Sequence, residues 1–160
     1  MKQKLKKLGI QLNKKIPIDE FLEKTLYEPT SGYYNNRIPF GNRGDFVTSP
    51  IISNLFSEII GIWIISTWER LGKPKILNLI ELGPGDGSLI KILFETFRKF
   101  PEFNKAIKIF LYEKSNLLRS IQKNKLKNKN IKWIKSFSQI KKGPVIFIGN
   151  EFFDAIPIKQ

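Results

Sequence analysis

One stretch of the chain combines an acidic side chain with three closely spaced glycines. Glu81 is followed by Gly83, Gly85 and Gly87, with an apolar run over residues 76–80 before it and an apolar helical pattern after it. A strand, a glycine-rich turn and a helix in this order are typical of a nucleotide-type cofactor site. Glycines suit such a turn because it is tight and because the backbone must approach the ligand closely.

The spacing of these glycines discriminates between cofactors. A G-x-G-x-G pattern with an acid two residues before its first glycine favours S-adenosylmethionine over NAD, whose fingerprint is G-x-G-x-x-G. We expect Glu81 to pair with the cationic methionine portion of this cofactor. The turn around it consists of Gly83, Pro84, Gly85 and Gly87. A tight turn that binds no ligand is the alternative interpretation.

Polar residues also follow the other predicted strands, and the carboxyl ends of the strands are where open α/β sheets bind ligands. Glu113 ends the second strand, where its two carboxylate oxygens match the two hydroxyls of a ribose. An ordinary exposed glutamate beside Lys114 is the alternative. Ser136 follows the third strand, and we assign it to the same cofactor site.

The segment after the fourth strand carries the candidate catalytic residues Asn150, Glu151 and Asp154. Its position places it beside the methyl group that the cofactor would carry. Glu151 and Asp154 are three residues apart and share a face if the segment is helical. Such a pair could hold a cationic acceptor, or it could cap a helix.

A glycine-containing polar segment over residues 41–50 is a candidate flap over the cofactor or the substrate. Its glycines let the backbone fold over a ligand. The residues that we assign to the cofactor are Gly44, Asp45, Phe46 and Thr48. The alternative is a loop that enters a helix, with Ser49 as the cap and Pro50 in the first turn.

Alternating strand and helix patterns predict a parallel sheet with crossover helices, which is an α/β fold. We expect strands over residues 76–82, 107–112, 131–134 and 145–149, with helices over 87–100 and 116–127. Before the sheet we expect helices over residues 4–15, 19–27 and from Pro50 to Trp68. The fold class is a Rossmann-like sheet of four parallel strands, incomplete at its C-terminus. We divide the chain into a helical and loop segment (1–72) and a cofactor-binding part (73–160).

Composition excludes several kinds of chemistry. The 160 residues include no Cys and no His, which removes disulfides, thiolate zinc sites and Cys or His nucleophiles, and no metal site is expected. Acid–base work must fall to carboxylates, Tyr or Lys. The net charge of +14 comes mostly from scattered lysines, so we do not expect a nucleic-acid partner. No apolar stretch reaches the roughly 18 residues that a membrane span needs, and a cytoplasmic location is the default.

Together these stretches resemble a known family, the MidA-like class I methyltransferases. This family includes mitochondrial enzymes that methylate arginine in complex I assembly. The matching stretches cover nearly the whole chain: Leu26-Tyr27-x-Pro29, Gly32-Tyr33-Tyr34, Gly44-Asp45-Phe46-x-Thr48-Ser49-Pro50, Phe56-x-Glu58, Glu81-Leu82-Gly83-Pro84-Gly85-x-Gly87, Glu113-x-Ser115-x-x-Leu118-Arg119-x-x-Gln122 and Asn150-Glu151-Phe152-Phe153-Asp154-Ala155-x-Pro157-x-x-Gln160. Two positions depart from the family pattern, Ile51 in place of an acid and Ser57 in place of a glycine.

The resemblance implies methyl transfer from S-adenosylmethionine to protein arginine, with a respiratory complex I subunit as the expected substrate. It also implies a mitochondrial matrix location if the source is eukaryotic. The family continues well beyond the position of Gln160, so the chain looks like its N-terminal portion, and a homodimer or a partner would cover the incomplete sheet. Two other functions stay open: a noncatalytic module that binds the cofactor or assembles a partner complex, and an RNA methyltransferase.

Overall fold

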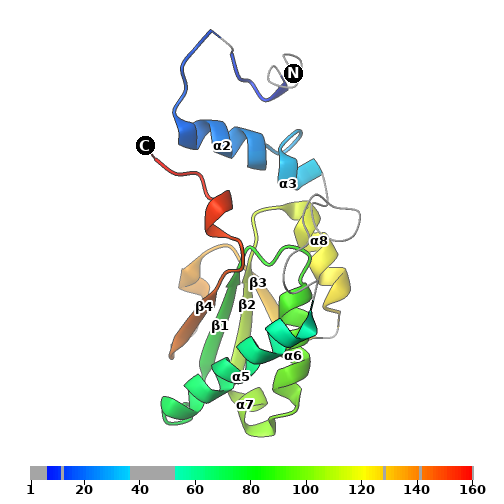
Figure 1. Cartoon of the computed structure of the whole chain (residues 1–160), viewed down its shortest axis with the longest axis vertical. Helices are drawn as coiled ribbons and strands as arrows, with labels where there is room; N and C mark the ends of the chain where they lie inside the picture. Colours follow the sequence, from blue (N-terminus) through cyan, green and yellow to red (C-terminus); the bar gives the residue numbers. More distant parts are fainter. Residues whose placement is uncertain (1–6, 12, 37–52, 128, 141, 160) are drawn as a thin grey trace.

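A computed structural model of the chain describes residues 7–11, 13–36, 53–127, 129–140 and 142–159. Its centre is a sheet of four parallel strands in the order β3-β2-β1-β4 (Figure 1). The strands are β1 (Leu77–Leu82), β2 (Ile107–Tyr112), β3 (Ile131–Ile134) and β4 (Val145–Ile148). The α/β fold with four parallel strands is therefore confirmed, and β1, which leads into the glycine turn, lies inside the sheet.

Helices pack on one face of this sheet (Figure 1). They are α5 (Asn54–Arg70), α6 (Ser88–Arg98), α7 (Pro101–Ala106) and α8 (Asn116–Lys125). Side chains alternate between the two faces of a strand, so Leu77 and Leu79 enter the main core with α5, α6 and α7. Ile80 points to the opposite face, where Phe110, Ile134 and Ile140 pack with it.

Several helix boundaries differ from the sequence-based expectations. The N-cap of α5 is Ser53, whose side chain accepts a hydrogen bond from the Leu55 amide. The helix α5 therefore begins at Asn54, later than the expected start at Pro50, and Ser49, the expected cap, lies outside the described residues. The predicted connector after Phe100 forms α7, because Pro101 occupies the first helical turn, where its missing N–H costs nothing.

Two short helices lie beyond the carboxyl ends of the strands, α2 (Ile18–Tyr27) and α3 (Tyr33–Asn36) (Figure 1). The helix expected over residues 19–27 is thus confirmed. In its described part, the helix expected over residues 4–15 is present only at Lys7, because the chain turns at Leu8 and Gly9, where Gly9 has a φ of 66°. Two single turns, η1 (Phe137–Gln139) and η2 (Phe153–Ala155), follow β3 and β4. None of the described helices is long and apolar enough to cross a membrane.

Candidate functional site

The glycine turn connects β1 to α6 through three residues with positive φ. Gly83, Gly85 and Gly87 have φ angles of 59°, 55° and 81°. Side chains on L-residues clash in this region, at a cost of roughly 1–2 kcal/mol per residue. Gly83 also donates a backbone hydrogen bond to the Tyr112 carbonyl at 3.0 Å, which ties the turn to the end of β2. The alternate glycines are therefore required by the backbone path of this turn.

Glu81 is a buried carboxyl group at the end of β1. The residue is 2% exposed, and its Oε2 atom has no hydrogen-bond partner among the described residues. Burial, and to a lesser degree the charges of Asp86 and Glu113, raises the pKa of Glu81 to about 8. A carboxylate in such a place is costly unless it is paired, so Glu81 is suited to a positively charged group.

Glu113 stands at the end of β2 and is held by two donors. Its Oε1 accepts from the Ser115 amide at 2.8 Å, and its Oε2 accepts from Gln122 Nε2 at 3.3 Å. Burial raises the pKa of Glu113, while these hydrogen bonds and the charge of Arg119 act in the opposite direction. Glu113 is thus a fixed hydrogen-bond acceptor beside the glycine turn.

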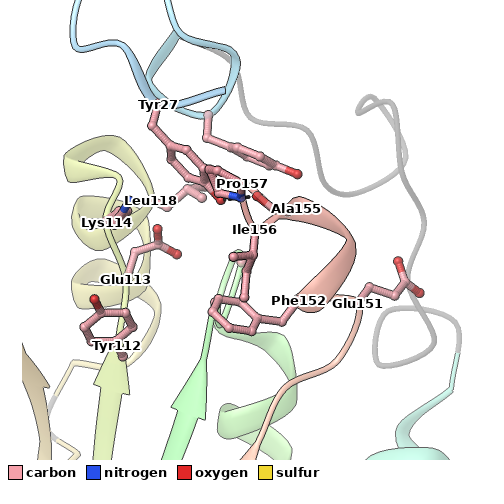
Figure 2. Close-up of a pocket in the computed structure, with 13 residues that line it drawn as sticks. Tyr27, Tyr112, Glu113, Lys114, Leu118, Glu151, Phe152, Ala155, Ile156 and Pro157 are labelled. Atoms are coloured by element: carbon pink, nitrogen blue, oxygen red, sulfur yellow. Dashed lines mark hydrogen bonds between the residues drawn. The ribbon is translucent and has the colours of Figure 1, made fainter. Parts of the chain in front are cut away.

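A pocket of about 230 Å³ lies between these elements (Figure 2). Gly83, Gly85 and Glu113 contribute to its lining, which also contains several aromatic rings. The remaining lining residues are Tyr27, Tyr34, Tyr112, Lys114, Leu118, Glu151, Phe152, Ala155, Ile156 and Pro157. An apolar cavity with a few convergent polar groups is the usual form of a small-molecule site.

The segment after β4 lies against the glycine turn. A Cβ atom on Gly83 would meet the Phe152 ring at 2.5 Å, so this ring packs on the bare backbone of the turn. Glu151 lines the pocket, has a φ of 50° and points away from Glu113 (Figure 2). Asp154 is exposed in η2, and neither it nor Asn150 lines the pocket. Glu151 precedes η2, so the two candidate carboxylates do not share one helical turn.

Tyrosines from α2 and α3 form a wall of the pocket, and they were not among the site residues predicted from the sequence. Tyr27 and Tyr34 stack with ring centroids 5.6 Å apart, and Lys114 Nζ lies 4.8 Å from the Tyr27 centroid. The Ser115 hydroxyl donates to the Tyr34 carbonyl at 2.7 Å. Burial raises the pKa of both phenols, and the charges of Glu113 and Asp154 add to it. The only signal in the sequence was that these tyrosines belong to the stretches that carry the family resemblance.

The remaining predicted residues have other positions. Ser136 is exposed and caps η1 in a capping box, away from the pocket lining. Pro84 and Gly87 belong to the turn but are buried behind the lining. Gly44, Asp45, Phe46 and Thr48 lie outside the described residues. Within the described ranges, no group of three acidic side chains is placed to hold a metal ion.

The chain is similar to known proteins in sequence and in fold. Residues 59–160 match the protein family described as "Putative S-adenosyl-L-methionine-dependent methyltransferase". The chain is 35% identical over 169 residues to the protein arginine methyltransferase NDUFAF7, mitochondrial, of Xenopus laevis, and 32% identical to that of Homo sapiens. Each alignment covers 91% of this chain, but only 39% and 38% of the respective relatives, so the chain spans about two fifths of their length.

A solved structure shows the same fold. It is a COG1565 superfamily member and likely methyl transferase from Burkholderia thailandensis, bound to S-adenosyl-homocysteine, with a TM-score of 0.74 and 26% identity. The match covers 89% of this chain and 38% of the other. The matched residues 59–160 include the glycine turn, Glu113 and the segment after β4. The chain therefore belongs to this family of S-adenosyl-L-methionine-dependent methyltransferases.

Proposed function

We propose that the chain binds S-adenosylmethionine at the carboxyl edge of its sheet and forms the methyl-transferring part of a protein arginine methyltransferase. The observation that carries this proposal is the unpaired, buried Oε2 of Glu81 directly before a turn with three positive-φ glycines. The likeness to the mitochondrial arginine methyltransferases supports the choice of acceptor.

The residues present fit this cofactor. Glu81 has an unpaired carboxyl oxygen for the ammonium group, in a buried position behind the pocket lining, and the bare backbone of Gly83 and Gly85 borders the pocket. Glu113 presents a carboxylate for the ribose hydroxyls. When bound, the cofactor supplies a methyl group that is activated by a neighbouring sulfonium. The side chains of the pocket then have to bind and orient the cofactor and the acceptor, and to exclude water. Catalysis is therefore mainly positioning and electrostatics.

The acceptor side is assigned to the segment after β4. An arginine guanidinium stays protonated because its pKa is above about 12, so carboxylates must hold it and polarise it. Glu151 lines the pocket, and Asp154 is close enough for its charge to act on Tyr27 and Tyr34. We assign both carboxylates to the guanidinium, with Asn150 as a further polar contact.

A transfer assay tests this function. The chain is incubated with cofactor labelled on its methyl group and with an arginine peptide, and a matched lysine peptide serves as the control substrate. Label should enter only the arginine peptide, and Glu151→Gln and Asp154→Asn should each reduce the rate at least tenfold while cofactor affinity is kept. Glu102→Gln, an equal change on a carboxylate that is 80% exposed on α7, should leave the rate unchanged. Equal labelling of both peptides, or unchanged rates in both carboxylate variants, would contradict the assignment.

Location and partners follow from the same relatives. Their mitochondrial designation favours a mitochondrial matrix protein if the source is eukaryotic, and a bacterial source implies the cytoplasm. A complex I subunit as substrate and a homodimer both belong to this proposal. Labelling of a respiratory-chain extract followed by identification of the methylated arginine would test the substrate.

A further inference from the structure

Gln122 is a buried polar side chain between the glycine turn and Glu113. It lies on α8, is 0% exposed, and its amide connects three different elements. Its Nε2 donates to the Gly85 carbonyl at 2.8 Å and to Glu113 Oε2 at 3.3 Å. Its Oε1 accepts from Trp133 Nε1 on β3 at 2.8 Å. Both N–H groups and the carbonyl oxygen of the amide are therefore engaged.

These contacts determine which orientation the amide takes. The indole N–H of Trp133 can only donate, so it fixes the oxygen of Gln122 on its own side. The two amide hydrogens must then point to the glycine turn and to Glu113. Rotation of the amide by 180° would place an N–H against the indole N–H and an oxygen against a carbonyl and a carboxylate, which leaves buried polar groups unpaired.

We infer that Gln122 is a positioning residue that couples the glycine turn to Glu113, so that the two halves of the cofactor site are held in one geometry. The helix places it well for this role. Ser115 caps α8 by accepting from the Leu118 amide at 3.2 Å, and the Gln122 carbonyl accepts from the Leu126 amide at 2.8 Å. The role of Gln122 toward the cofactor rests on the proposed function, whereas its effect on Glu113 does not.

The surroundings of Glu113 show what Gln122 does electrostatically. On its own side of the pocket, Glu113 faces Arg119, whose charge lowers its pKa, and the backbone N–H groups of Lys114 and Ser115. From the opposite elements it faces Tyr27 and Tyr34, and on β1 it faces Glu81. Burial raises the pKa of Glu113, and the Gln122 N–H is one of the few groups that oppose this effect. Gln122 therefore keeps Glu113 available as an acceptor.

Substitution of Gln122 separates this role from a merely structural one. Gln122→Met keeps the length of the side chain but removes both donors. We expect the midpoint of the Glu113 carboxyl titration, followed by carbon NMR in the free protein, to move to higher pH. We also expect the affinity for S-adenosylmethionine to fall about tenfold, since hydrogen bonds to charged groups are among the stronger ones.

Trp133→Phe is the matched control. It removes the third hydrogen bond of the same amide and should reduce stability. The Gly85 carbonyl and Glu113 are both acceptors, so they should still hold the amide hydrogens in the same orientation. Its Glu113 midpoint should equal that of the wild type. If Gln122→Met and Trp133→Phe shift this midpoint equally, or if neither shifts it, the inference is overturned.

Two further variants keep the test decisive. If Gln122→Met does not fold, the nearly isosteric Gln122→Glu, which cannot donate to both acceptors when ionised, should move the midpoint in the same direction. In a Glu113→Gln background, Gln122→Met should cost much less cofactor affinity than it does alone, and an equal cost would contradict the coupling. A wild-type chain that binds no cofactor would refute the proposed function, while the NMR titration would still decide the role of Gln122.

Discussion

The hydroxyl group of Tyr27 donates a 2.9 Å hydrogen bond to the backbone carbonyl of Ala155, 128 residues further along the chain. This bond joins the end of α2 to the segment after β4, which carries Glu151 and Asp154. The same tyrosine ring stacks on Tyr34 and receives the Lys114 ammonium group on its face. The N-terminal helices are thus a wall of the pocket, and one hydroxyl group connects them to the segment after β4.

Tyr27→Phe removes that hydrogen bond and leaves the ring in place. The loss of one such bond costs about 1 kcal/mol, so the segment after β4 should open about fivefold more often. The amides of Ala155 and Ile156 donate only long hydrogen bonds, of 3.2 and 3.3 Å, within η2. We expect their hydrogen exchange to accelerate by about this factor and the KM for an arginine peptide to rise.

Tyr34→Phe is the control for this change, because its hydroxyl has no hydrogen bond to the segment within the described part of the chain. Exchange at Ala155 and Ile156 should match the wild type in this variant. Equal acceleration of exchange in both variants would show that the hydrogen bond from Tyr27 to Ala155 does not hold the segment.

Packing between Gly83 and Phe152 predicts a coupled pair of substitutions. Gly83→Ala places a Cβ against the Phe152 ring and also forces alanine into a positive φ, at about 1–2 kcal/mol for the backbone alone. Phe152→Ala removes the collision but not the backbone strain. Urea unfolding should therefore show that Gly83→Ala costs less stability in the Phe152→Ala background, with a coupling energy of about 1 kcal/mol or more.

Gly72→Ala separates strain from collision. Gly72 has a φ of 79°, and a Cβ on it would meet nothing within 4 Å. Its substitution should cost only the strain of the backbone, less than Gly83→Ala. Equal losses of stability in the two glycine variants would mean that the Phe152 ring moves aside without cost and does not pack on the turn.

The buried carboxyl group of Glu81 predicts an unusual dependence of stability on pH. Its pKa is about 8 in the folded chain and near 4.5 when the group is in water. Between these two values the folded state binds a proton that the unfolded state has released, so stability falls as pH rises, by up to about 1.4 kcal/mol per pH unit. The Glu81→Gln variant has no titratable group at this position, so its stability lacks this dependence on pH.

Unfolding free energies of Glu81→Gln and the wild type should therefore be compared from pH 5 to pH 8. The variant should gain stability relative to the wild type as pH rises through this range. A constant difference between the two proteins would contradict the burial and the unpaired state of this carboxyl group.

The sequence alone predicted the strands and the glycine turn that position the site. Apolar runs bounded by glycines and by polar strand ends predicted all four strands, because parallel strands carry apolar residues along most of their length. The edge strand β4 follows this pattern although Val145 and Phe147 are exposed. Glu81 and Glu113 were singled out as candidate site residues for the same reason, since an acid that interrupts such a pattern at a strand end is conspicuous. The turn glycines were singled out because such a turn is tight, and their positive φ angles agree with that expectation.

Residues that act through tertiary contacts could not be found in this way. Tyr27 reaches Ala155 only because α2 lies beyond the carboxyl ends of the strands, and a helical pattern does not state where a helix packs. Gln122 sits in a lysine-rich helix, and its role depends on Gly85 and Trp133, which are far from it in sequence. Ser136 followed a strand end as expected, but a local capping box uses its side chain instead.

The most direct test of the cofactor site is calorimetric titration of the chain with S-adenosylmethionine, performed on the wild type and on Glu81→Gln. The account predicts saturable binding to the wild type and at least tenfold weaker binding to the variant, because a neutral amide cannot pair with the ammonium group of the cofactor. It would be contradicted if the folded wild-type chain gave no saturable binding, or if Glu81→Gln bound the cofactor as tightly as the wild type.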